Sequence, residues 1–147
     1  MPQEDTVSAL LDQLDAEWAR LRELLAGKDE QALAQRPPSG KWSVQENVRH
    51  LVFAELAHLI RFVPGAGQDW SAAPLPPHNL QVHMREKMVG TAATSVREAL
   101  DVWQPLHATI RAALAQQDTD DARYRLGRHI KHLHQHVDEV ARLLRRL

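Results

Sequence analysis

Apolar residues recur every three or four positions along four long stretches of this 147-residue chain, and no stretch shows the strict alternation of a half-buried strand. Such periodicity is typical of amphipathic helices that bury one side. We therefore expect an all-α, four-helix bundle that forms a single domain over residues 1–147. In the last stretch, 124–147, this spacing is kept by Leu126, Ile130, Leu133, Val137, Val140, Leu144 and Leu147.

Local signals mark where the helices begin and end. Ser43 stands three residues before Glu46, and Ser95 stands three residues before Glu98. This pattern is the capping box, in which two side chains bond the free backbone amides at the start of a helix. Gly27 favours the end of the first helix, because glycine readily adopts the left-handed conformation found there. The helices are expected at about residues 5–27, 43–63, 95–116 and 124–147.

A long segment separates the second and third helices. Between Pro64 and His78 the content of Pro, Gly and Ala favours a loop, and Leu80–Met88 favours a short helical piece. Trp70 in this loop could cover a site as a lid, or could only anchor the loop to the surface. The bundle is therefore expected to contain one long connection between its second and third helices.

Charge and composition exclude several classes of partner. Eighteen basic residues against nineteen acidic ones leave a formal net charge of -1, so no overall field attracts nucleic acid. The N-terminal residues lack the basic segment and apolar run of a signal peptide, and charges interrupt every long apolar segment. We expect a cytoplasmic protein that has neither a nucleic-acid partner nor a membrane partner.

Histidines are concentrated near the C-terminus, where four of the nine lie between His129 and His136. His132 and His136 are four residues apart, so on a helix they can direct two nitrogens at one point, as paired metal ligands do. His129 lies on the same edge, whereas His134 points to the other edge and is expected at the surface. The cluster could also be a solvated helix face. With no cysteine in the chain, any metal must be held by imidazole, carboxylate or water, and a third ligand must come from another helix.

Two separated motifs resemble one known family. The sequence KWSVQENVRHLVFAE, at residues 41–55, is similar to the W-S-x-x-E-x-x-x-H-L pattern that opens the second helix in the DinB/YfiT-like superfamily. HLHQHVDEV, at residues 132–140, resembles the H-x-x-x-H pattern of its fourth helix. The helix order, the chain length and the long connection also fit. The resemblance implies a four-helix bundle of the DinB/YfiT-like type over essentially the whole chain.

The resemblance also implies a metal site. In that family one histidine of helix two and two histidines of helix four hold one divalent ion, and by position these are His50, His132 and His136. Three neutral imidazoles suit zinc or nickel and leave coordination positions open. His129 departs from the family pattern. It could replace or supplement His132, or could orient a ligand through a hydrogen bond.

The family further suggests what such a site does. Known members include metal-dependent transferases that use low-molecular-weight thiols, so a transferase of this type or a hydrolase is expected, with a small thiol or another small molecule as substrate. Glu46 or Glu139 could orient a ligand or move a proton. Two alternatives remain open: a stress-related bundle in which a metal only links two helices, and an interaction module without metal. Broad apolar helix faces also suggest a homodimer.

Overall fold

The computed structural model describes residues 6–64 and 95–147, and all its regular elements in these ranges are helical. The all-α prediction is therefore confirmed. Trp70 and the short helical piece expected at Leu80–Met88 lie outside the described residues. No described helix has the length and apolar character needed to cross a membrane. The elements are α1 (Val7–Leu25), α2 (Glu30–Leu33), α3 (Val44–Leu59), the 3-10 turn η1 (Ile60–Phe62), α5 (Val96–Leu114) and α6 (Asp120–Leu144).

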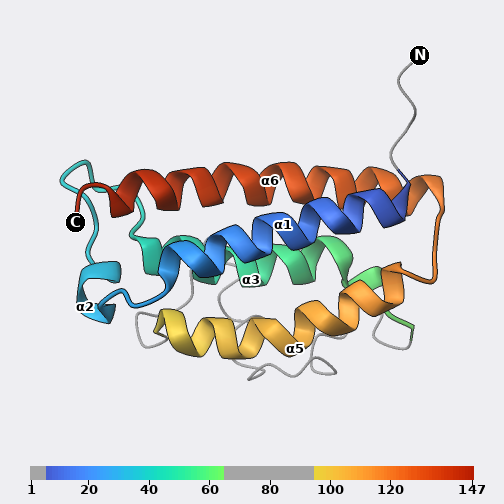
Figure 1. The fold of residues 1–147 in the computed structure, drawn as a ribbon, viewed down its shortest axis with the longest axis horizontal. Coiled ribbons are helices and arrows are strands. Elements are labelled where there is room, and N and C mark those ends of the chain that lie inside the picture. The colour runs from blue at the N-terminus through green and yellow to red at the C-terminus, as the bar shows by residue number, and fades with distance from the viewer. Residues whose placement is uncertain (1–5, 65–94) are drawn as a thin grey trace, which may run out of the picture.

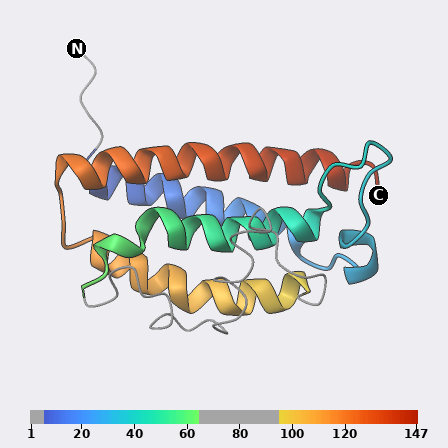
Figure 2. The ribbon, with the colours of Figure 1, turned by 180° about the vertical axis from the view of Figure 1, so that it is seen from behind.

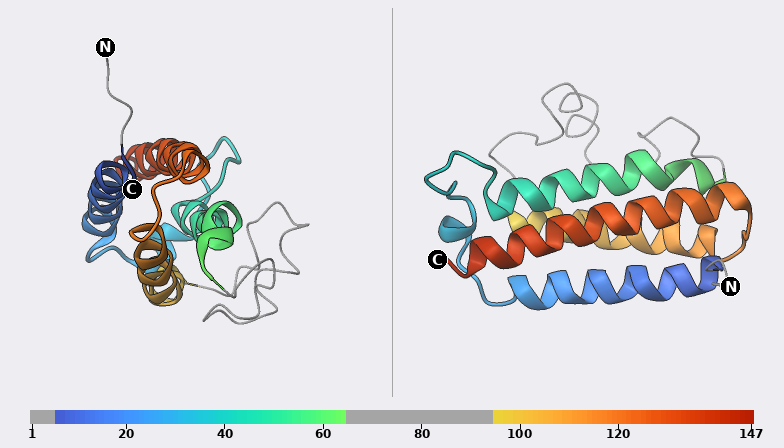
Figure 3. Two further views of the ribbon diagram at one scale, coloured as in Figure 1. Left: turned by 90° about the vertical axis from the view of Figure 1, so that its right-hand side faces the viewer. Right: turned by 90° about the horizontal axis from the view of Figure 1, so that it is seen from above.

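The four long helices lie side by side as a bundle (Figure 1). Seen along its length they surround one core, in which α6 packs against α1 and α3, and α5 packs against α3 (Figure 3). The colour gradient shows that α3 and α5 run in the same direction, opposite to α1 and α6 (Figure 2). Two successive helices that run in parallel need a long connection between them, as the sequence predicts.

Apolar side chains from all four long helices fill the core. Leu14 of α1, Leu51 of α3, Trp103 of α5 and Leu133 of α6 are fully buried. Burying a side chain of this size contributes roughly 1.5–3 kcal/mol to folding. Trp103 also makes an edge contact with Trp18 of α1, with ring centroids 4.3 Å apart. This packing fixes the distance between α3 and α6, the helices that carry the histidines of interest.

Both predicted capping boxes are present. At the start of α3 the Ser43 hydroxyl accepts a hydrogen bond from the Glu46 amide at 3.1 Å, and Glu46 Oε1 accepts one from the Ser43 amide at 3.0 Å. Ser95 and Glu98 make the same pair of bonds at the start of α5. The first helix ends as expected, since Gly27 has a φ of 71° in the turn that follows it.

The start of the last helix differs from the prediction. The polar residues before Tyr124 suggested a loop, but α6 already begins at Asp120. The Thr119 side chain accepts a hydrogen bond from the Ala122 amide at 3.1 Å and so caps the helix. Asp120 and Asp121 lie in the first turn, where acidic side chains interact favourably with the positive end of the helix dipole. Capping therefore starts the helix one turn before the larger apolar residues of its buried side.

Candidate metal centre

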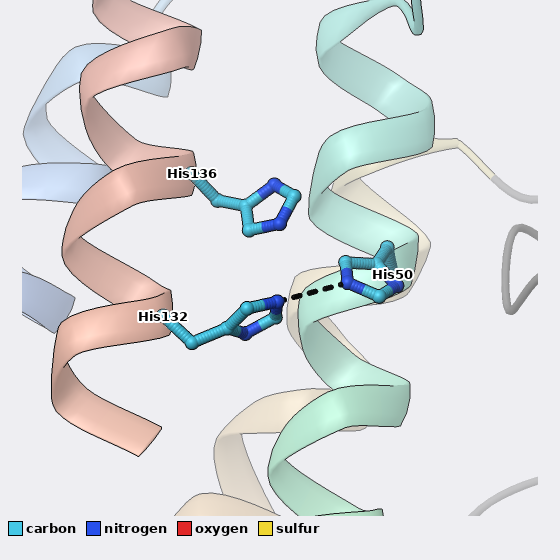
Figure 4. Close-up of side chains that lie close together, drawn as sticks. All are labelled: His50, His132 and His136. Carbon is cyan, nitrogen blue, oxygen red and sulfur yellow. Dashed lines mark hydrogen bonds between the residues drawn. The ribbon is translucent and has the colours of Figure 1, made fainter. Parts of the chain in front are cut away.

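Three histidines meet in the interface between α3 and α6. Each of His50, His132 and His136 offers one ring nitrogen, and these nitrogens all lie within 4.8 Å of one another. Figure 4 shows the His50 ring of α3 reaching toward the two rings of α6. The structure thus brings together the three residues expected from the sequence, although His50 is 82 residues away from His132.

The spacing of the nitrogens fits a shared metal ion. His50 Nε2 and His132 Nε2 lie 3.2 Å apart. Two nitrogens bound to one tetrahedral zinc ion, each at about 2.0–2.1 Å, would be about 3.3 Å apart. The centroid of the His136 ring lies 4.5 Å from that of the His132 ring and 4.8 Å from that of the His50 ring. The three side chains could therefore hold one divalent ion with little rearrangement.

The environment keeps these imidazoles neutral, which is the form that binds metal. Burial, with smaller contributions from the charges of His136 and His58, lowers the pKa of His50 to about 4. Burial and the neighbouring imidazoles lower the pKa of His132 to about 3. The pKa of His136 is also lowered by burial. At pH 7 each ring therefore carries a lone pair available to an ion.

Asn47 fixes the orientation of His136. The amide nitrogen of Asn47 donates to the Ser43 carbonyl at 2.9 Å, so its oxygen faces the other way, toward His136 Nδ1 at 2.8 Å. An amide oxygen only accepts, so the proton of the neutral His136 ring must sit on Nδ1. His136 Nε2 is left unprotonated. Outer hydrogen bonds of this kind orient the ligands of many metal sites.

Trp42 covers one side of the cluster. Its indole lies 5.0 Å from the His50 ring and is stacked at 6.4 Å on the His136 ring, measured between centroids. His50 itself is only 7% exposed, whereas His132 and His136 are half-buried. An apolar wall of this kind lowers the local dielectric constant and strengthens electrostatic interactions at the site. The centre is thus partly shielded from water while two of its rings remain accessible.

Two other histidines of α6 have partners of their own. His129 does not join the three-histidine group. It is fully buried, with Nε2 at 3.1 Å from Glu55 Oε1 and Nδ1 at 3.1 Å from His58 Nδ1. His134 is exposed, as expected, and pairs with Glu17 of α1 at 2.6 Å.

The two glutamates that could orient a ligand or move a proton, Glu46 and Glu139, have partners outside the three-histidine group. Glu46 completes the α3 capping box and accepts two hydrogen bonds from Arg36, at 2.8 and 2.6 Å. The bond to Arg36 lowers the pKa of Glu46. Glu139 pairs with Arg142 one turn further along α6. Both glutamates therefore have structural partners, which favours a role in helix stability for each.

Some residues around the centre were missed by sequence reasoning. Asn47 precedes His50 by one helical turn, so its spacing could have indicated a neighbour on the same face. Glu55 and His58 gave no such signal, since from sequence alone a glutamate or a histidine on a helix is expected to face solvent. Only the packing of α3 against α5 and α6 brings these two side chains to the site.

Comparison with known proteins agrees with this architecture. The family model of the DinB superfamily matches residues 13–145, a range that includes most of α1, the whole of α3, α5 and α6, and all three clustered histidines. Searches of curated proteins and of solved structures found no match. Since the match covers nearly the whole chain, this protein belongs to the metal-binding DinB superfamily.

Proposed function

We propose that this protein binds one divalent metal ion through His50, His132 and His136 and uses it as an enzyme. The expected reaction is transfer to or from a low-molecular-weight thiol, or hydrolysis of a small molecule. The observation that carries the proposal is the convergence of three neutral imidazole nitrogens from two helices within 4.8 Å.

The number of ligands favours catalysis over a purely structural ion. Within residues 6–64 and 95–147, no fourth histidine or carboxylate joins the group. Structural zinc sites are usually closed by four protein ligands, whereas catalytic sites combine three with an open position. The half-buried rings of His132 and His136 leave this position accessible to a small molecule.

The chain itself supplies binding and orientation. Asn47 holds His136 in the tautomer that presents Nε2, and Trp42 limits the access of water. A divalent ion bound here would act as a Lewis acid that lowers the pKa of a thiol or a water molecule at its open position. The donor set of three imidazoles without thiolate suits zinc or nickel, which we propose as the ions bound.

Metal content tests the proposal directly. Untagged protein, purified without added metal and then dialysed against zinc or nickel, should contain about one ion per chain by elemental mass spectrometry. His50→Ala and His136→Ala should each lose most of the ion. His134→Ala is the matched control, because His134 lies on the same helix but is exposed and bound to Glu17. Equal metal content in all three variants would refute the assignment.

Turnover separates an enzyme from a bundle that the ion only links together. The metal-loaded protein should accelerate thiol transfer or hydrolysis in a screen of small electrophiles and esters, and His50→Ala should abolish the acceleration. Cobalt-loaded protein should also change its visible spectrum when a small thiol is added, because an open position accepts the thiol. A spectrum that no thiol or anion alters would indicate a closed, structural ion.

A further inference from the structure

A buried carboxylate lies behind His129 and belongs to none of the three expected metal ligands. Glu55 of α3 is 0% exposed and is enclosed by α5 and α6. Its oxygens accept hydrogen bonds from Trp103 Nε1 at 2.8 Å and His107 Nδ1 at 2.9 Å, and His129 Nε2 lies 3.1 Å away. Burial raises the pKa of Glu55, but the hydrogen bonds from His107 and His129 outweigh it and lower the pKa to about 2. Glu55 is therefore an ionised carboxylate, which accepts hydrogen bonds and donates none.

The Glu55 carboxylate determines which ring nitrogens of His129 and His58 carry a proton. A nitrogen that faces a carboxylate oxygen must carry a proton, so a neutral His129 ring holds its proton on Nε2. His129 Nδ1 is then an acceptor, and it lies 3.1 Å from His58 Nδ1. His58 Nδ1 must therefore donate. When each of these two rings carries a single proton, the two contacts leave no other assignment of the protons.

The chain of hydrogen bonds from Glu55 thus ends at His58 Nε2, which keeps a lone pair. His58 is half-buried and packs edge-on against the His132 ring, with centroids 5.5 Å apart. It is also close enough to His50 for a charge on its ring to lower the pKa of His50. His58 is therefore a fourth imidazole at the edge of the metal centre, outside the group of three that could share an ion.

We propose that Glu55 and His129 are positioning residues that fix His58 as a hydrogen-bond acceptor beside the metal centre. The site would then select ligands that bring a proton, such as a thiol or water, over anions that have none. This inference rests on the proposed function, because it concerns what occupies the open position of the ion. It adds a determinant of ligand choice that the three metal ligands alone do not provide.

Charge supports the same arrangement in the metal-loaded protein. A divalent ion held by His132 would repel a positive charge on His58 or His129, both of which lie close to it. Neutral rings that share a single proton between their Nδ1 atoms avoid this repulsion. The negative charge of the Glu55 carboxylate behind them would attract the ion.

The substitution Glu55→Gln should reverse the direction of the hydrogen bonds that run from residue 55 through His129 to His58, with almost no change in side-chain shape. Glu55 Oε2 is the closer acceptor for both Trp103 and His107, so the amide oxygen of the new residue can replace it. The amide NH2 would then face His129 Nε2 and donate to it. His129 would shift its proton to Nδ1 and donate to His58, which would be left with its own proton on Nε2. The hydrogen-bond direction at the metal centre would be inverted without a change in side-chain shape.

Glu17→Gln is the matched control. It is the same chemical change opposite another histidine of α6, because Glu17 pairs with the exposed His134 at 2.6 Å. His134 points away from the centre, so this variant should leave His58 unaffected. Thermal unfolding of both variants checks that each remains folded.

Nitrogen NMR of the histidine rings gives the first readout and needs neither metal nor variant. At pH 8, above the ordinary histidine pKa of about 6.5, wild-type His129 should be the Nε2–H tautomer and His58 the Nδ1–H tautomer. Both should invert in Glu55→Gln and persist in Glu17→Gln. A wild-type His58 that carries its proton on Nε2 would overturn the proposal.

Anion binding gives the second readout. Azide added to the cobalt-loaded protein should change the visible spectrum, and Glu55→Gln should bind azide roughly tenfold more tightly, because a hydrogen-bond donor replaces a lone pair and 1.4 kcal/mol corresponds to tenfold. Glu17→Gln should match the wild type. Equal azide affinity in all three proteins would overturn the proposal. If cobalt and zinc do not bind at all, the proposed function fails, but the wild-type tautomers still test the hydrogen-bond chain.

Discussion

The Asn47 amide orients the His136 ring within the candidate metal centre. It is held by the Ser43 carbonyl on one side and contacts His136 Nδ1 on the other. Asn47→Ala should therefore leave the fold intact and weaken zinc binding about 10- to 100-fold, the usual effect of removing an outer partner of a ligand. Competition with a chromophoric chelator would measure the affinity.

Two further variants make this prediction specific. Asn47→Asp keeps an oxygen that accepts from His136 Nδ1, so it should retain most of the zinc affinity. Gln45→Ala removes an amide from the same turn of α3 that makes no contact with His136, and it should have little effect. If Asn47→Asp weakens binding as much as Asn47→Ala, the orientation of His136 does not depend on this hydrogen bond.

Individual site residues differ in how far the sequence could predict them. The spacing of His132 and His136 on one helix indicates a pair of ligands without further information. His50 lies on a different helix, and only the resemblance of its surrounding motif identified it as their partner. The bonds of His129 to Glu55 and His58 depend on the rotation of α3 and α6 about their axes, which no local pattern specifies. Periodicity places a residue on a face, but it does not say which neighbour that face meets.

The two capping boxes allow the stability of a helix to be separated from the function of the site. Ser43→Ala and Ser95→Ala each remove the hydroxyl that caps α3 or α5. Each should lower the free energy of unfolding by about 1 kcal/mol, the typical value of an N-cap. Chemical denaturation would measure this loss.

Only one of the two caps lies next to the metal centre. The Ser43 carbonyl holds Asn47, so fraying of the first turn of α3 should also weaken zinc binding in Ser43→Ala. Ser95 begins α5, which contributes none of the three clustered histidines, so Ser95→Ala should bind zinc as the wild type does. Equal loss of zinc affinity in both variants would show that general destabilisation, and not the local cap, is responsible.

Helix positions were largely predictable because the relevant signals are local. The capping boxes and the apolar spacing identified α1, α3 and α5 to within a few residues of their observed bounds. The start of α6 was missed because its first turn carries only one small apolar residue, Ala122, and is stabilised by Thr119 and by the acidic residues that follow. The N-cap at Thr119, and not the hydrophobic pattern, therefore sets the start of α6.

The bundle as a whole determines the electrostatic character of the centre. Packing α6 against α3 places the ring of His58 together with the three clustered imidazoles in a partly buried interface. At low pH this arrangement lowers the stability of the fold, because burial disfavours the protonated form of these rings and so lowers their pKa. An ion bound between the helices would offset that cost by occupying the lone pairs.

The metal-free protein should therefore lose stability as the pH falls. Folded His50 and His58 have pKa values of about 4 and His132 of about 3, whereas an unfolded histidine has a pKa of about 6.5. Between pH 6.5 and pH 4 the unfolded state binds more protons, so the free energy of unfolding decreases as the pH is lowered. Urea unfolding of metal-free protein at several pH values from 7 to 4 would measure the slope.

Substitutions on α6 assign this slope to the cluster. His132→Gln removes one depressed pKa, so stability should depend less steeply on pH between 6.5 and 4 than in the wild type. His134 is the control with the opposite sign: its hydrogen bond to Glu17 raises its pKa, so its small contribution is present below pH 6.5 and is lost as the pH rises. His134→Gln should therefore steepen the loss toward low pH slightly or leave it unchanged. If His132→Gln leaves the slope unchanged, the burial of these imidazoles is not what makes the bundle sensitive to acid.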